Sequence, residues 1–180
     1  MKKPNWRKWI KNKEDCKNWL DSYLKKEMIA ESDKEKKMYY NKSMHNLNLA
    51  NWLNEKQDVL KELFDENFYD WVITVYYYSV YHASLALVSM LGYKSRSHMS
   101  TLCFIIYNYY HGESEIKEDD IKIIAESIDK EDIDVIAESK SLRERASYNI
   151  HETFEKELAD DVKNKTVKFL EKTRTILEIE

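Results

Sequence analysis

An uncharged stretch from Trp71 to Leu91 constrains the fold more than any other part of this chain. It has the length of about six turns of α-helix, and Gly92 follows it directly. Apolar residues occur on every side of such a helix, which is typical of a segment buried in a bundle or in a bilayer. Gly92 is a residue that commonly ends a helix in the left-handed conformation, and Ser97 can cap the next helix.

The polar side chains in the middle of this stretch decide between a bundle and a bilayer. Tyr76, Tyr77, Tyr78, Tyr81 and His82 lie near its centre. Such groups cost free energy in hydrocarbon unless they are paired, and tyrosine is typical of the edges of a bilayer. The sequence therefore predicts a buried helix and no membrane partner.

Glycine and proline are scarce along the whole chain. The 180 residues include two glycines and one proline, Pro4, whereas residues that favour helix dominate. This length suits one domain with a sizeable core. We therefore expect a single all-α domain over residues 1–180.

Charge and cysteine usage bound the functional class. The net charge of -4 excludes a uniformly basic nucleic-acid binder, but it does not exclude a local basic patch. Cys16 and Cys103 are too few for a disulfide framework. Residues 1–17 are basic and interrupted by Trp and Asn, which does not match a secretory signal, so we expect a reduced, cytoplasmic protein.

Helical periodicity and turn residues predict the order of the elements. The expected helices are a first one from Pro4 to Leu24; a second from a Ser32 or Asp33 cap to Phe64, interrupted near residues 41–54; the central one to Leu91; one from Ser97 to Gly112; a short one over 121–128 after an acidic linker at 113–120; one over 132–148; and a final one with apolar positions from Val162 to Leu177. Asparagines motivate the interruption in the second helix, because they lower helix propensity.

Metal and cofactor signatures are missing from the sequence. No glycine-rich phosphate loop, no Glu-x-x-His pair and no zinc-ligand spacing of histidines or cysteines occurs. The sequence predicts neither a metal site nor a cofactor.

Aromatic and histidine side chains of the central region have two interpretations. Tyr77, Tyr81, His82 and His98 are explained either by hydrogen bonding in the core or by contact with a substrate. Together with Trp71, the two tyrosines are also suited to hold a flat ring such as a nucleobase. The basic, tryptophan-rich first helix has the same ambiguity between core packing and nucleic-acid binding.

The segment Ser141–Phe154 has the clearest chemical potential. Arg145 and His151 are separated by five residues, and Arg143 lies close by. A histidine can move a proton near neutral pH, and a guanidinium offsets charge that develops on a phosphate. This combination is typical of metal-independent RNA cleavage, whereas the alternative is a charged helix face beside a surface histidine.

Three sequence blocks resemble the HEPN family, in particular its small stand-alone prokaryotic members. Tyr77-Tyr78-Ser79-Val80-Tyr81-His82-Ala83 resembles the family's YYAxFHA helix. Ser97-His98 is similar to the start of the family's next helix, and Leu142–Tyr148 (LRERASY) resembles its LRxxADY ending. The resemblance covers residues 45–180 and leaves residues 1–40 as an added N-terminal helix.

The resemblance implies an up-and-down bundle of four to five core helices, usually a homodimer. It implies a toxin or defence protein acting on RNA, with Arg145 and Arg143 holding phosphate and His151 as acid or base. Tyr77, Tyr81, His82, His98 and Tyr148 are then the residues expected to contact substrate. The alternative is a non-catalytic nucleotide-binding or interaction module, and a small nucleotidyltransferase antitoxin is a possible partner in either case.

Overall fold

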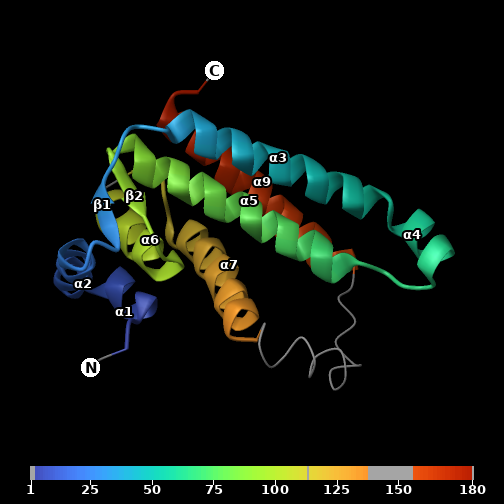
Figure 1. The fold of residues 1–180 in the computed structure, drawn as a ribbon, viewed down its shortest axis with the longest axis horizontal. Helices are drawn as coiled ribbons and strands as arrows, with labels where there is room; N and C mark the ends of the chain where they lie inside the picture. Colours follow the sequence, from blue (N-terminus) through green and yellow to red (C-terminus); the bar gives the residue numbers. More distant parts are fainter. Residues whose placement is uncertain (1–2, 113, 138–155, 180) are drawn as a thin grey trace.

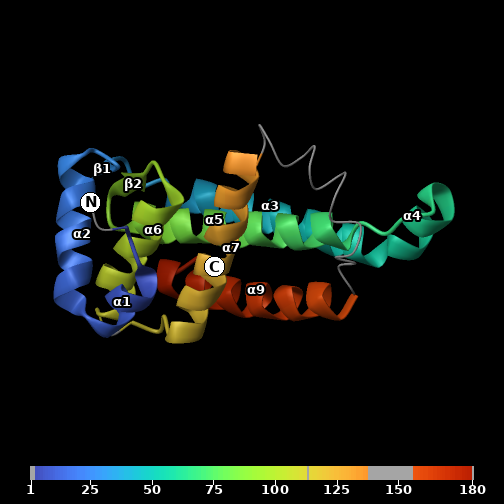
Figure 2. The same cartoon turned by 90° about the horizontal axis from the view of Figure 1, so that it is seen from below.

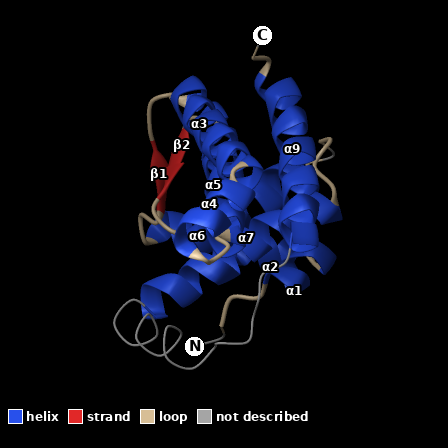
Figure 3. Ribbon diagram, turned by 90° about the vertical axis from the view of Figure 1, so that its right-hand side faces the viewer, coloured by secondary structure: helices blue, strands red, loops and turns tan. Residues whose placement is uncertain are grey.

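The protein is mostly helical, with one small antiparallel sheet (Figures 1 and 3). The computed structural model describes residues 3–112, 114–137 and 156–179, and side-chain environments up to residue 127 and again from 156. Its elements are α1 (Trp6–Lys11), α2 (Lys13–Lys25), β1 (Ile29–Glu31), α3 (Lys36–Glu55), α4 (Gln57–Phe64), α5 (Tyr69–Met90), β2 (Tyr93–Ser95), α6 (His98–Ile105), the π-helix η1 (Ile106–Tyr110), α7 (Glu118–Ala137) and α9 (Lys156–Leu177). The expectation of an all-α chain is therefore confirmed except for the sheet.

Helix α5 is the centre of the structure and packs against α3, α7 and α9. Its residues Val72, Val80, Ala83 and Leu87 are fully buried, as the uncharged sequence predicts. Helix α3 runs antiparallel to α5, and α9 lies beside both, whereas α7 crosses α5 steeply (Figures 1 and 2). Among the described residues, no helix is long and apolar enough to cross a membrane.

The predicted interruption of the second helix near residues 41–54 is wrong, because α3 is continuous there. Its asparagines are used for contacts between helices. Asn51 accepts a hydrogen bond from the Tyr76 hydroxyl (2.8 Å), and Asn54 donates to Asp160 at the start of α9 (3.1 Å). Pairing of these amides in the bundle outweighs their weak helix propensity. The chain instead breaks at Lys56, between α3 and α4.

Two short helices replace the single first helix that the sequence predicts. Helix α1 begins after Asn5, whose side chain accepts from the Lys8 amide, so Pro4 precedes the cap. Asn12 then ends α1 and caps α2 by accepting from the Asp15 amide at 2.9 Å. An asparagine side chain at each cap satisfies amides that a helix end leaves unpaired.

The first two helices pack on α6 and η1 of the same chain (Figure 2). Trp9 and Cys16 are fully buried there, and the Sγ atoms of Cys16 and Cys103 lie 3.9 Å apart. The hydrogen bond with Cys16, and then burial, raise the pKa of the Cys103 thiol. Trp9 of the tryptophan-rich first segment is therefore core, whereas Trp6 is partly exposed.

The two-stranded sheet was not expected from the sequence. Strand β1 pairs antiparallel with β2, with Ala30 opposite Lys94 (Figure 3). Each strand has three residues, which is too short for an alternating pattern to stand out. The sheet joins the end of α2 to the connection between α5 and α6.

Helix caps agree with the sequence in one case and differ in another. Ser97 caps α6, since its Oγ accepts from the Ser100 amide as predicted. At α3, neither Ser32 nor Asp33 caps the helix; the cap residue is Glu35, whose amide donates to Ser89 Oγ of α5 at 2.7 Å. A neighbouring helix supplies this acceptor, which local sequence cannot reveal.

Helix α7 is longer than predicted. It begins at Glu118, inside the expected acidic linker, and continues past the break expected between residues 128 and 132. Acidic side chains in its first turn stabilise the positive end of the helix dipole. Helix α9 buries Val162, Phe169, Leu170 and Leu177, as the sequence predicts.

The two glycines are required for different reasons. Gly92 has φ +82, and a Cβ there would make only ordinary van der Waals contacts, 3.9 Å from Lys34 Cε and from the Ser32 oxygen. A Cβ on Gly112 would collide with the main-chain carbonyl of Asn108. We expect Gly92→Ala to lower the free energy of unfolding by about 1–2 kcal/mol, the cost of a left-handed backbone, and Gly112→Ala to lower it more. Urea denaturation measures the free energy of unfolding of both variants. Equal losses for Gly92→Ala and Gly112→Ala would contradict this prediction.

A candidate histidine and tyrosine site between α3, α5 and α6

Tyr81, His82 and His98 come together in the structure. Tyr81 and His82 lie in the middle of α5, and His98 is the first residue of α6. The Tyr81 and His98 rings have centroids 4.1 Å apart, and those of Tyr81 and His82 are 5.9 Å apart. All three side chains are partly exposed. We call these three residues the His–Tyr cluster.

The contacts of Nδ1 position the His82 ring. Its Nδ1 lies 2.8 Å from the main-chain oxygen of Tyr78, one turn earlier on α5. Because a carbonyl oxygen only accepts, Nδ1 donates to it. Nδ2 of Asn46 in α3 lies 3.2 Å from the same ring nitrogen. His82 is thus positioned by contacts with α3 and with its own helix.

Serine hydroxyls fix the start of α6, where His98 lies. Ser100 Oγ lies 2.6 Å from Ser95 Oγ and 2.8 Å from Ser97 Oγ. The sequence predicts a capping role for Ser97 but no role for Ser95 or Ser100. From helix propensity, Asn46 is expected only to weaken α3. A serine in a short connection and an asparagine in a helix give no local signal of these contacts.

Tyr77 does not belong to the His–Tyr cluster. Its side chain is almost fully buried, and burial is the main cause of its raised pKa. The carboxylates of Glu126 and Asp161 raise the pKa further, so the hydroxyl faces the side of α5 that α7 and α9 cover. Trp71, in contrast, is largely exposed. The structure therefore does not support one aromatic pocket formed by Trp71, Tyr77 and Tyr81.

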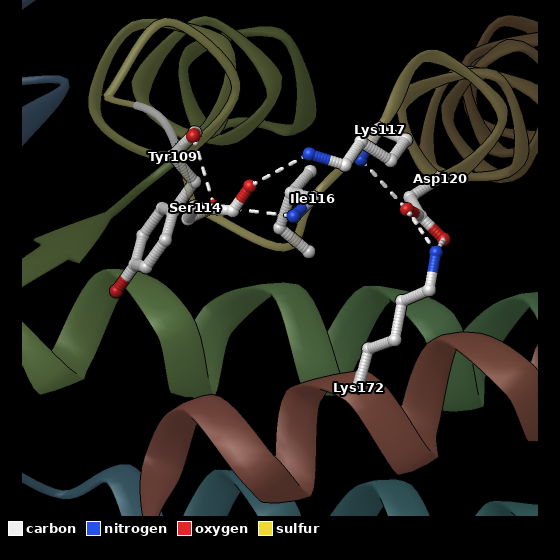
Figure 4. Close-up of polar contacts among 6 residues, drawn as sticks. All are labelled: Tyr109, Ser114, Ile116, Lys117, Asp120 and Lys172. Carbon is white, nitrogen blue, oxygen red and sulfur yellow. Dashed lines mark hydrogen bonds and ion pairs between the residues drawn. The ribbon is translucent and has the colours of Figure 1, made fainter.

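A second polar cluster joins α7 to α9 (Figure 4). Asp120 is nearly buried; it accepts from the Lys117 amide at 2.8 Å and from Lys172 Nζ at 2.7 and 3.0 Å. Ser114 accepts from the Ile116 amide, and its hydroxyl donates to the Tyr109 carbonyl. These bonds hold the first turn of α7 on α9, so we assign the cluster to structure.

A hollow of about 560 Å³ lies beside this ion pair. Its charged lining mixes both signs: Glu115, Asp119, Asp120, Glu126 and Glu171 with Lys122, Lys165, Lys168 and Lys172. Three of these lysines are paired: Lys122 with Glu118 and Asp119, Lys165 with Asp161, and Lys172 with Asp120. With its charges of both signs interspersed, the hollow lacks the concentrated positive charge that a phosphate site needs.

In the described part of the chain, no three His, Cys, Asp or Glu side chains gather in a way that could hold a metal ion. Arg143, Arg145, Tyr148 and His151 lie outside the described residues. They belong to residues 138–155, between the end of α7 and the start of α9.

The chain matches no protein-family model, no curated protein and no solved structure.

Proposed function

We propose that this chain is a HEPN-type protein that acts on RNA, as a metal-independent endoribonuclease of a toxin or defence system. The observation that carries the proposal is the contact between the Tyr81 and His98 rings, whose centroids are 4.1 Å apart. It joins two sequence blocks that resemble the family, the Tyr-Tyr-x-x-x-His-Ala helix and the Ser-His helix start. The buried α5 beside α3 and α9 suits the core of a HEPN-like bundle.

In this proposal, Arg145 holds the scissile phosphate, Arg143 assists, and His151 moves the proton. The histidine takes the proton of the 2′-hydroxyl while the 2′-oxygen bonds to phosphorus. The bond from phosphorus to the 5′-oxygen breaks as the 5′-oxygen gains a proton. The guanidinium offsets the charge that develops on the phosphate oxygens. The His–Tyr cluster supplies partly exposed rings for contact with substrate.

A homodimer is part of the same proposal. Large exposed apolar side chains occur on α3, α4 and the first turn of α5, and we call them the α4 surface: Leu49, Trp52, Val59, Leu63, Phe64 and Trp71. Helix α4 projects at one end of the bundle (Figure 1). The hydrogen bond from Asn54 to Asp160 places the first turns of α9 at this end. A second copy bound there covers apolar surface near the point where the chain enters α9.

Cleavage of RNA in EDTA tests the proposed activity. The purified chain is incubated with a mixed RNA pool and, as a matched control, with DNA of the same sequences. We expect RNA to be cut and DNA to remain intact, because the reaction needs the 2′-hydroxyl. Cleavage of neither would favour a non-catalytic module that binds a nucleotide or a protein, such as a nucleotidyltransferase, through the α4 surface.

A further inference from the structure

The N-terminal helices carry a concentration of positive charge in a chain whose net charge is -4. Residues 1–13 include no Asp or Glu, and their cations are Lys2, Lys3, Arg7, Lys8, Lys11 and Lys13. The side chains from Lys3 onward in this set are exposed. Among the described residues, no carboxylate forms an ion pair with Arg7, Lys8 or Lys11. This part of the surface therefore attracts anions.

Helix geometry places Arg7 and Lys11 on the same face of α1. Trp9 is fully buried, so the opposite side of α1 points away from the core. Arg7 and Lys11 are four residues apart and are neighbours on that outer side. Lys8 is exposed beside them. The basic face is thus held in place by the buried tryptophan rather than by ion pairs.

Aromatic rings border the same charges. The Arg7 guanidinium lies over the Trp6 ring, 4.6 Å from its centroid. Lys13 Nζ lies 5.9 Å from the centroid of the Tyr107 ring in η1, and it donates to the His111 carbonyl at 3.1 Å. Both rings are partly exposed. We call this region the N-terminal basic surface: Lys3, Trp6, Arg7, Lys8, Lys11, Lys13 and Tyr107.

We infer that the N-terminal basic surface binds single-stranded RNA, with its cations on the phosphates and its rings against the bases. Cations that follow a backbone, beside rings on which bases stack, are the usual means of binding single strands without sequence preference. A membrane partner needs an exposed apolar helix face, whereas Trp9 is buried and Ile10 packs on the core. An acidic protein would use the charges but not the rings.

This inference rests on the proposed function for the choice of RNA. Apart from Tyr107, it assigns substrate binding to residues outside the HEPN resemblance. Its test is the binding of a labelled 2′-O-methyl oligouridine, measured by fluorescence anisotropy on the full chain over a range of salt concentrations. The ligand lacks a 2′-hydroxyl and cannot be cleaved by the proposed reaction. Binding is therefore measured separately from catalysis.

The test variant is Lys8→Gln with Lys11→Gln, and its matched control is Lys25→Gln with Lys26→Gln, two exposed lysines at the far end of α2. For the test variant we expect the salt dependence of log K to become shallower by about 1.4, the share of two phosphate contacts on a single strand. We also expect its affinity at low salt to fall about tenfold. The control should bind as the wild type does.

A ring variant separates stacking from charge. Trp6→Leu should weaken binding about tenfold without changing the salt dependence, because stacking on a base releases no counterion. Circular dichroism checks that each variant remains folded. Poly-glutamate and phosphatidylserine vesicles serve as competing ligands. Competition by either as strong as that by unlabelled oligouridine would overturn the inference.

The outcomes separate this inference from the proposed activity. Equal binding by the test variant, the control and the wild type overturns the inference, even where RNA is cleaved in EDTA. Absence of binding by the wild type also overturns it. Binding that depends on Lys8 and Lys11, in a protein that cleaves no RNA, supports the surface and contradicts the ribonuclease.

Discussion

His151→Ala is expected to lower the rate of RNA cleavage in EDTA by about 10²–10⁴-fold, the usual contribution of a positioned acid or base. The reason is that no metal is available to activate the 2′-hydroxyl, so the reaction depends on a side chain that exchanges protons near neutral pH. The measurement is the initial rate with one labelled RNA at fixed protein concentration.

His45→Ala is the matched control, because His45 is an exposed histidine on α3 that makes no proposed contact with RNA. It should cleave at the rate of the wild type. Arg145→Lys keeps the charge but loses the planar fork, and we expect a rate about 10²–10³-fold lower. Equal cleavage by His151→Ala and the wild type would exclude His151 as the acid or base.

Phe64→Asp is expected to weaken self-association by about 30-fold or more, the effect of losing about 2 kcal/mol at a central interface residue. The Phe64 side chain is 60% exposed in the single chain, and a charge there would be buried against the second copy. Analytical ultracentrifugation over a range of concentrations measures the dimer constant. The wild type should reach twice the chain mass of 21.7 kDa.

Met38→Asp is the control for this substitution. Met38 is 56% exposed, at the other end of α3 from α4, so its replacement adds the same charge away from the proposed interface. It should leave the dimer constant unchanged. A wild type that remains monomeric at all concentrations, or a Phe64→Asp variant that dimerises as Met38→Asp does, would contradict the use of the α4 surface by a second copy.

The sequence predicts those parts of the fold that depend on local patterns. The uncharged run predicts α5, Gly92 predicts where this helix ends, and Ser97 predicts the cap of α6. Each of these signals comes from residues that are adjacent along the chain. Burial of α9 at Val162, Phe169 and Leu177 follows from helical spacing in the same way.

Other parts depend on contacts between distant segments, and the sequence could not predict them. From helix propensity alone, the asparagines of α3 predict a break in the helix. In the structure, Asn51 and Asn54 form hydrogen bonds with α5 and α9 instead. The main-chain amide of Glu35, at the start of α3, donates to the hydroxyl of Ser89, which lies 54 residues away in the sequence. Strands of three residues leave no periodic pattern, so the sheet was missed.

The candidate site is predictable to a similar extent. Tyr81, His82 and His98 could be named from the sequence, and the structure brings them together. Tyr77 could not be separated from them, because the side of a buried helix that faces α7 and α9 is set by packing rather than by spacing. Asn46, Ser95 and Ser100, which support the site, have no local signal.

The measurement that tests the central claim most directly is the chemistry of the RNA ends after cleavage in EDTA, by mass spectrometry of a defined oligonucleotide. Attack by the 2′-hydroxyl predicts a 2′,3′-cyclic phosphate or its hydrolysis product on one fragment and a 5′-hydroxyl on the other, and neither forms with His151→Ala. Fragments with a 5′-phosphate and a 3′-hydroxyl, or an intact oligonucleotide, would contradict a histidine-dependent, metal-independent ribonuclease.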